Sequence, residues 1–354
     1  MKKLNLISMF FSVAAITALI FVAACTKEGP QGPPGQDGED GINGTDGTAT
    51  CGVCHNFSEE LTAKIAQYNK STHATGVTSF EGNREACAPC HTSKGFRECL
   101  ETDTTVTAAP ISNPTQPNCY TCHNIHQTYS ATDWALATTD PVTFRFNAGN
   151  AGMSFDGGSG NLCANCHQAR TISPYPDATN LTGTVTFTSF RYGPHYGVQS
   201  QVISGQAGFE LGFDGAVTHA HSAIENTCVT CHLAEPFGQL AGGHQMGMYI
   251  EEEGAYNFAG CLGCHTDEDA LAENTEELMT EVTTLETQLW DLLVTEGIAD
   301  PNNVGYAVPG TYTNLVTGAF LNYKFVHHDR SKGVHNPTFT KTLLENSIAA
   351  LEGK

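Results

Sequence analysis

The chain has 354 residues, of which 37 are Asp or Glu and 16 are Lys or Arg, so its formal net charge at pH 7 is −21. A charge this negative argues against nucleic-acid binding and against docking on anionic lipid, because both ligands are polyanions. It favours solubility and weak, charge-steered contacts with basic partners. The 14 cysteines are the other unusual feature of the composition.

The first 24 residues have the pattern of a secretory signal peptide. Lys2 and Lys3 form its positively charged start, and an apolar run from Ile7 to Val22 follows. The run is short for a stable transmembrane helix and lacks stop-transfer charges, and no later apolar stretch of the sequence is long enough to span a membrane. We therefore expect residues 1–24 to direct export of the protein.

The signal ends in Val22-Ala23-Ala24-Cys25, which resembles the bacterial lipobox. In a lipobox the cysteine becomes the new N-terminus and carries lipid; here Val22 stands where leucine is usual. The alternative is a plain secretory signal with a cleavage site of the Ala-x-Ala kind. The lipobox interpretation predicts lipidation at Cys25 and a mature protein that is anchored to a membrane outside the cytoplasm.

Residues 25–50 form a separate segment in which glycine recurs at every third position from Gly29 to Gly47. This is the collagen repeat, in which only glycine fits the crowded axis of three polyproline-II chains. A single chain of this composition cannot bury a core, so we expect an extended stalk of on the order of 60 Å. A trimerising triple helix is the alternative, and it would make the protein a homo-oligomer through the stalk.

Six copies of Cys-x-x-Cys-His follow, and they account for 12 of the 14 cysteines. The pattern is the covalent attachment site of a c-type haem, because the two thiols add to the two vinyl groups of one porphyrin and the histidine becomes the proximal ligand of its iron. The cofactor-binding cysteines are Cys51, Cys54, Cys87, Cys90, Cys119, Cys122, Cys163, Cys166, Cys228, Cys231, Cys261 and Cys264. The proximal iron ligands are His55, His91, His123, His167, His232 and His265.

Six Cys-x-x-Cys pairs could instead form three zinc sites of four thiolates each, redox dithiols or disulfides. None of these alternatives requires the histidine that follows the second cysteine in every copy. Covalent haem attachment is completed outside the cytoplasm, in agreement with the export signal. The sequence therefore predicts six covalent haem c groups, and it leaves Cys99 as an odd thiol.

Residues 51–354 are expected to form one hexahaem cytochrome c domain that is mostly irregular and α-helical, with little β-structure. At roughly 51 residues per haem, each unit is marginal at burying a core of its own. We therefore expect loops and short helices wrapped around six haems, with the porphyrins as the core and a short helix after each motif.

Three stretches of the sequence have a clean period. Residues 184–190 alternate between polar and apolar side chains and predict a strand. Residues 268–296 place apolar side chains at the i, i+3 and i+4 positions of one long amphipathic helix. Asn336 and Pro337 predict the start of a C-terminal helix that runs through Leu351, because proline fits the first helical turn.

The chemistry open to each haem depends on whether a second protein ligand fills the sixth position of its iron. Nine histidines lie outside the motifs, which is enough to supply six. His126 is three residues after His123, so it cannot bind the opposite face of the same iron, and as a ligand it would tie two haems together. His219 and His221 point to one face of an extended chain, and one iron face needs only one of them.

Four segments resemble the surroundings of distal haem ligands in multihaem cytochromes c of environmental bacteria. They are Ser71-Thr-His73, the stretch from Gly193 through His195 to Gly205, Gly242-Gly-His244-Gln-Met-Gly247, and Ser331-Lys-Gly-Val-His335-Asn-Pro337. The last of them, followed by a helix, resembles the C-terminal part of the ammonia-forming nitrite reductase group. The resemblance implies four distal ligands, and position adds His126 and one of His219 and His221. The ligand set is taken as His73, His126, His195, His221, His244 and His335.

Those nitrite reductases use a Cys-x-x-Cys-Lys haem as their open catalytic site, and none of the six motifs here ends in lysine. We therefore expect an electron carrier rather than an enzyme, with six mainly bis-histidine haems of low potential and no catalytic residue. The alternative is an oxidoreductase that acts on a nitrogen or sulfur oxyanion, such as nitrite, hydroxylamine or tetrathionate, at one five-coordinate haem. A third hypothesis is a conducting filament of stacked protomers, which a lipid anchor fits poorly.

The expected location is the outer membrane or the cell surface, and a periplasm-facing orientation is also compatible with the sequence. The expected partners are other redox proteins, cytochromes among them, or extracellular electron acceptors such as minerals and humic matter. No nucleic acid is expected among them.

Overall fold

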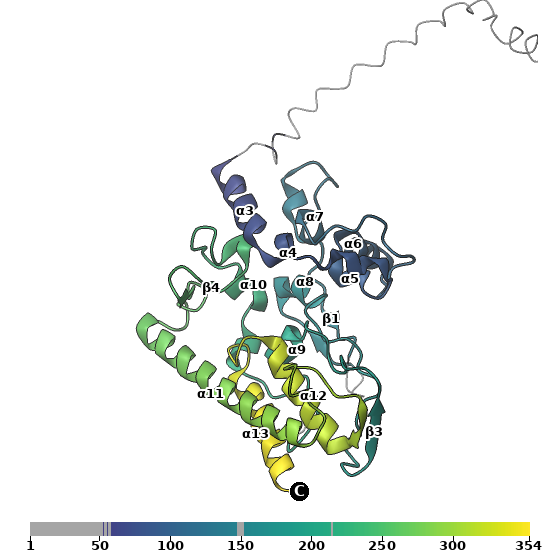
Figure 1. Ribbon diagram of the computed structural model, residues 1–354. Coiled ribbons are helices and arrows are strands. Elements are labelled where there is room, and N and C mark those ends of the chain that lie inside the picture. The colour runs from purple at the N-terminus through teal and green to yellow at the C-terminus, as the bar shows by residue number, and fades with distance from the viewer. Residues whose placement is uncertain (1–51, 53–54, 56–57, 147–151, 214) are drawn as a thin grey trace, which may run out of the picture. The chain divides into compact units, whose positions relative to one another are not determined.

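The computed structural model describes residues 52, 55, 58–146, 152–213 and 215–354 of the chain (Figure 1). The chain divides into two units, Met1–Gly47 and Thr48–Lys354, and the described residues all belong to the second. The predicted signal peptide, Cys25, the stalk and both cysteines of the first motif therefore lie outside the described residues.

Short helices make up the N-terminal part of the second unit. Hydroxyl side chains start several of them, since Ser58, Ser71 and Thr92 each accept a hydrogen bond from a backbone amide of the helix that follows. Between these helices the chain runs in turns and loops. The elements are α3 (Glu59–Lys70), α4 (Thr72–Thr75), η1 (Thr78–Asn83), α5 (Ala88–His91), α6 (Ser93–Thr102), α7 (Cys119–Cys122) and η2 (Ala131–Trp134).

The middle of the unit mixes short helices with short strands. Its elements are β1 (Val142–Thr143), β2 (Ser154–Phe155), η3 (Gly158–Gly160), α8 (Asn161–Ala164), β3 (Thr184–Phe187), α9 (Gln199–Ser204), η4 (Ala220–Ala223), α10 (Thr227–His232), η5 (Gly243–Gln245), β4 (Tyr249–Ile250) and β5 (Ala255–Tyr256). Among the described residues the strands form three antiparallel pairs, β1 with β2, β3 with β6 (Gly310–Thr313), and β4 with β5. The predicted strand over 184–190 corresponds to β3.

Three long helices dominate the C-terminal part and lie side by side in Figure 1: α11 (Glu268–Thr295), α12 (Asn314–Asp329) and α13 (Pro337–Glu352). The strand β6 (Gly310–Thr313) leads into α12. α11 occupies the stretch where the sequence predicts a long amphipathic helix, and Asn336 caps α13 through its side chain. α12 was not predicted. It is buried almost all round, so it has no polar face that would reveal a helical period.

An apolar core of protein side chains lies between these helices, strand β3 and the loop around Phe209. The sequence led us to expect the porphyrins as the core, with ordinary core packing for the two helical stripes; in this part of the chain the core consists of protein side chains. Phe209, Phe320, Phe339 and Leu289 are fully buried there, and each buried side chain of this size contributes about 1.5–3 kcal/mol. Residues 58–135 are different, because their only buried apolar side chains are Ala88, Pro89, Phe96, Cys99 and Ile111.

The motifs differ from expectation in one local respect. A short helix was expected after each motif, but α5, α7, α8 and α10 coincide with motif residues instead. α6 and α11 then follow the second and sixth motifs after a gap of one or a few residues. No helix within the described part of the chain combines the length and apolar character that a membrane span requires.

Candidate haem sites

One turn of helix presents the second cysteine and the histidine of each described motif. The backbone N–H of the motif histidine donates to the carbonyl of the first cysteine at 3.2 Å in the second motif and at 2.9 Å in the third, fourth and sixth motifs. In the fifth motif the whole sequence lies within α10. This turn places two sulfurs and one imidazole on a common side of the chain, which is the arrangement that attachment to one porphyrin edge needs.

Every motif histidine faces one histidine from a distant part of the chain. The ring centroids of the six pairs are 6.0–6.4 Å apart. The partners are six different residues, so the pairing is one to one. The pairs are His55 with His126, His91 with His195, His123 with His244, His167 with His73, His232 with His335, and His265 with His221.

The separation of these rings fits a shared metal ion better than ring stacking. With about 2 Å from metal to nitrogen and roughly 1.1 Å from nitrogen to ring centre, two imidazoles on opposite faces of one iron have centroids about 6.2 Å apart. The six distances lie within 0.2 Å of this value, whereas the angles between the ring planes range from 22° to 79°. A contact between the rings themselves would constrain the angle, but a common metal constrains the distance.

Burial favours the neutral, metal-binding form of several of these imidazoles. It lowers the pKa of His73 to about 4, with His167 contributing, and it also lowers the pKa of His232 and His244. The pKa of His335 shifts in the other direction. Burial disfavours its charged form, but the adjacent Asp329 carboxylate outweighs burial and raises the pKa of His335. A neutral imidazole offers one nitrogen lone pair to a metal, so the donor set fits an iron ligand.

The other ring nitrogen of several paired histidines is held by the protein. Nδ1 lies 2.7 Å from the Trp134 carbonyl in His123, 2.7 Å from the Val334 carbonyl in His221, and 2.8 Å from the Met246 carbonyl in His232. A hydrogen bond at Nδ1 fixes the tautomer and leaves Nε2 free to bind a metal. These carbonyls therefore orient the rings toward their partners.

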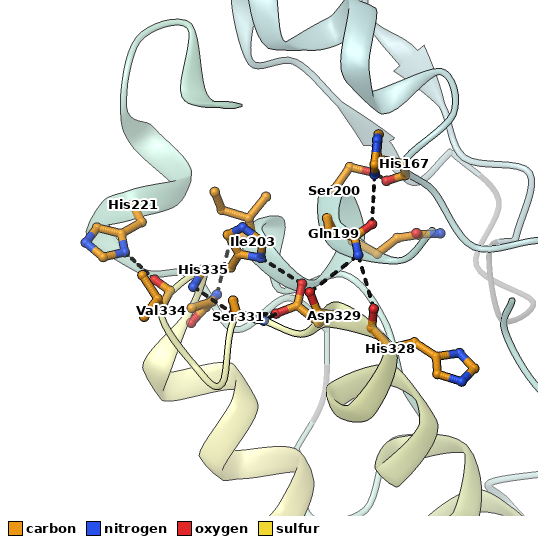
Figure 2. A network of polar contacts seen from close by, with 12 residues as sticks. His167, Gln199, Ser200, Ile203, His221, His328, Asp329, Ser331, Val334 and His335 are labelled. Carbon is orange, nitrogen blue, oxygen red and sulfur yellow. Dashed lines mark hydrogen bonds and ion pairs between the residues drawn. The ribbon is translucent and has the colours of Figure 1, made fainter. Parts of the chain in front are cut away.

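Three further imidazoles have side-chain partners at Nδ1. Figure 2 shows Gln199 Oε1 at 3.1 Å from His167 Nδ1, and Asp329 Oδ1 at 2.7 Å from His335 Nδ1. In the third case, Met246 Sδ lies 3.2 Å from His73 Nδ1. Asp329 is buried and its other oxygen accepts from Ser331 Oγ, so the carboxylate is fixed in place. Sequence reasoning missed these partners, because nothing in the local sequence marks them.

The described motif cysteines are all free thiols, as attachment to a porphyrin requires. Cys99 is also free, but it is buried on α6, and burial raises the pKa of its thiol. The structure therefore gives Cys99 the surroundings of a core side chain.

The three histidines outside the pairs have other contacts. His219 Nδ1 accepts from the backbone N–H of His221 at 3.3 Å and so caps η4. His328 is buried on α12, and its Nδ1 lies 3.0 Å from the carbonyl of His195. His327 faces Glu286 at 3.4 Å. The sequence left open the choice between His219 and His221. In the structure His219 caps η4, and His221 faces the motif histidine His265.

The six paired sites, numbered here 1 to 6 by their motifs in chain order, adjoin one another through short contacts. Sites 1 and 3 share the segment from His123 to His126, and sites 5 and 6 meet where His221 binds the carbonyl of Val334, next to His335. The loop from His244 to Met246 serves sites 3, 4 and 5, because Met246 contacts both His73 and His232.

Site 2 contacts site 4 through residues of the second and fourth motifs. Cys90 Sγ lies 3.9 Å from the Asn165 carbonyl, and Cys166 Sγ lies 3.7 Å from the Pro89 carbonyl. Sites 4 and 5 meet in a similar way, since Cys228 Sγ lies 3.9 Å from the Gly160 carbonyl, at the start of α8. The contacts therefore connect the sites in the order 1, 3, 4, 5, 6, with site 2 joined to site 4.

The whole chain was compared with known proteins. No family model and no curated protein matches the sequence. Among solved structures, the chain is similar to the crystal structure of the outer cell wall cytochrome OcwA, with a TM-score of 0.53 and 17% identity, over 81% of this chain and 50% of that one. An undecahaem cytochrome from the S-layer of Carboxydothermus ferrireducens matches 83% of this chain and 40% of its own, with a TM-score of 0.46 and 20% identity. The chain thus spans about half the length of OcwA and shares the fold of a solved cytochrome.

Proposed function

We propose that this protein transfers electrons through six covalently bound c-type haems at the cell surface. The observation that carries the proposal is the set of six histidine pairs, in which every motif histidine faces a different distant histidine at 6.0–6.4 Å. Each pair would hold one haem iron, and the two motif cysteines would attach its porphyrin. The distal ligands are then His73, His126, His195, His221, His244 and His335.

The pairing favours an electron carrier over an enzyme. A haem held in this way supplies a one-electron ferric/ferrous couple. With two imidazoles as ligands, each iron would have no open position at which an oxyanion could bind. Two histidines also favour lower potentials than a histidine and a methionine do. The protein's own contribution is to orient the rings and to keep neighbouring sites in contact.

The order of the sites supports transfer along the chain of contacts. Electron transfer between two haems slows steeply as their edges move apart, so contact between attachment sites is the feature that a relay needs. Cys228 Sγ of site 5 lies 3.9 Å from the carbonyl of Gly160, at the start of α8, and sites 4 and 5 both contact Met246. Sites 1 and 3 share the segment from His123 to His126. We infer a main path through sites 1, 3, 4, 5 and 6, with a side path at site 2.

The cellular setting is proposed on two grounds. The solved cytochrome with the same fold is described as a protein of the outer cell wall. The sequence of this chain adds an export signal and a lipobox-like Cys25 followed by a Gly-x-y stalk. A lipid anchor and an extended stalk would hold the cofactor domain away from the membrane, within reach of other cytochromes or of extracellular acceptors.

The test of the proposed function is to count the haems and determine the spin state of every iron. Intact mass spectrometry is expected to show six covalent haem additions on one chain. Electron paramagnetic resonance is expected to show six low-spin irons that bind neither cyanide nor nitrite in the folded protein. One high-spin iron that binds nitrite and reduces it at about 1 per second or faster would replace the carrier with an oxidoreductase.

His221→Ala is expected to convert one of the six low-spin irons to high-spin, because His221 faces His265 at 6.4 Å. The matched control is His219→Ala, two residues away, since His219 faces no motif histidine and caps η4. The control is expected to retain six low-spin irons in the same resonance experiment. A high-spin signal from the control with none from His221→Ala would assign the ligand to His219 instead.

Asp329→Asn is expected to raise the midpoint potential of one haem, the one at site 5. A carboxylate bound to His335 Nδ1 makes the imidazole a stronger donor and stabilises ferric iron, and asparagine offers only a neutral amide oxygen. Hydrogen bonds to charged groups are worth roughly 1.5–3 kcal/mol, so we expect about a tenfold change in the reduction equilibrium, or about 59 mV for one electron. A spectroelectrochemical titration measures it.

The control for this change is Asp291→Asn, which removes the same charge from an exposed position on α11. It is expected to leave all six potentials within error of the wild type, since exposed charges are screened by salt. An equal shift in both variants would mean that net charge, and not the bond to His335, sets the potential.

Cys25→Ser is expected to release the protein from the membrane fraction, because the lipid would have no attachment point. Haem content and the low-spin spectrum are expected to stay the same, since residues 48–354 form a unit of their own. Fractionation followed by haem staining measures both. Continued membrane association of the variant would argue against an anchor at Cys25.

A further inference from the structure

The arginines of this acidic chain gather around one of the six sites. The chain has six arginines and a net charge of −21, so an even distribution would leave every site in acidic surroundings. Five of the six instead lie near site 2, the site of His91 and His195. They are Arg84, Arg145, Arg170, Arg191 and Arg330.

Three of these arginines are exposed and free of acidic partners. Arg170, Arg191 and Arg330 form no ion pair with any carboxylate among the residues that the structure describes. The other two are engaged, since Arg84 pairs with Glu81 and the Nη1 atom of Arg145 lies 3.9 Å from Cys90 Sγ. The three exposed guanidinium groups are therefore available to a ligand.

Aromatic rings position two of the three. Arg330 lies over the ring of Tyr196, with its Cζ 5.8 Å from the centroid, and that ring is 5.5 Å from the ring of His195. Arg191 lies over Phe190 at 5.3 Å, four residues before His195. Cation–π contacts of this kind hold a guanidinium in place while its N–H groups stay exposed to solvent. Tyr196 and Phe190 are themselves about half exposed, so the surface beside His195 is open.

Arg170 reaches site 2 on a different segment of the chain. The next residue, Thr171, donates from its Oγ1 to the carbonyl of Arg145 at 3.1 Å, and Nη1 of Arg145 lies 3.9 Å from Cys90 Sγ at site 2. At moderate salt, charges farther away than about 10 Å are largely screened. The local field at site 2 is therefore positive, although the protein as a whole is negative.

We propose that site 2 is the place where this protein exchanges electrons with small anionic redox partners, which Arg170, Arg191 and Arg330 attract. The proposal rests on the proposed electron-transfer function and adds the position and charge of one partner class. In the step, an oxidised anion gains one electron and one ferrous iron becomes ferric, with no bond formed and no proton moved. The side position of site 2, joined to site 4, lets this exchange proceed without interrupting the main path.

The competing explanation is that the arginines only neutralise the carboxylates of the haem at site 2. That haem would carry two propionates, whereas three arginines are exposed and unpaired. The two explanations differ in what removal of the arginines does. Loss of propionate partners would alter the potential of the site 2 haem, and loss of an anion site would abolish local binding of an anion.

The test uses hexacyanochromate(III), an anion that is paramagnetic and does not react. In the full-length haem-loaded protein it is expected to broaden the nuclear magnetic resonance signals of one haem, and His195→Ala identifies those signals as site 2 by converting that iron to high-spin. The variant Arg170→Gln, Arg191→Gln, Arg330→Gln is expected to lose the broadening. The oxidation of the reduced variant by hexacyanoferrate(III) is expected to be roughly tenfold or more slower than that of the reduced wild type at low ionic strength.

The matched control is Lys64→Gln, Lys341→Gln, Lys354→Gln, which removes the same charge from lysines that pair with Glu60, Glu281 and Glu296. It is expected to keep the broadening and the oxidation rate. Oxidation by hexaammineruthenium(III), a cation, is expected not to slow in the arginine variant.

Three outcomes would overturn the proposal. They are equal effects in the arginine and lysine variants, broadening at a haem other than site 2, and a shifted site 2 potential with unchanged broadening. The haem count and spin states are measured on the same samples, so a failure of the electron-transfer proposal would be seen separately.

Discussion

The structure depends on one constraint, which is that two imidazole rings from distant parts of the chain must face each other across a gap of 6.0–6.4 Å six times over. Each pair closes a loop, and the loops overlap in sequence. His73 reaches forward to the fourth motif, and His335 reaches back to the fifth. A metal at the centre of each pair would cross-link the two segments, and cofactor attachment would then be coupled to folding.

The two halves of the described unit depend on the histidine pairs to different degrees. Residues 58–135 bury few apolar side chains, so their loops depend on the histidine pairs and on caps such as Ser58, Ser71 and Thr92. The C-terminal helices have an apolar core, which holds α12 rigidly. The end of α12 then serves three sites. His328 binds the carbonyl of His195, the carbonyls of His328 and Asp329 accept from Gln199 beside His167, and Asp329 binds His335 (Figure 2).

The sequence predicted features that are local or periodic. The motifs, the stripe that became α11 and the proline start of α13 are all of this kind. α12 escaped prediction, because a helix buried on every side carries no amphipathic stripe. Family resemblance suggested four of the predicted distal histidines and position suggested two, but which motif each one faces could not be predicted, since that depends on contacts between segments far apart. For the same reason Asp329, Met246 and Gln199 had no sequence signal.

Because all six sites have the same pair of imidazoles, differences between them must come from the groups around the pairs. The Nδ1 partners are backbone carbonyls at His123, His221 and His232, a thioether at His73 and a carboxylate at His335. A carboxylate favours the oxidised iron, whereas a thioether is a poor hydrogen-bond acceptor and makes its imidazole a weaker donor.

Positive charges act in the opposite direction to the carboxylate. Lys324 is buried on α12 beside Gly193, and its Nζ donates to the carbonyl of Gly305 rather than to a carboxylate. Together with the arginines around His195, it favours the reduced iron at site 2. One helix therefore brings a buried anion to site 5 at its end and a buried cation toward site 2 from its middle. Identical ligands can in this way give unequal potentials, and unequal potentials give a relay its direction.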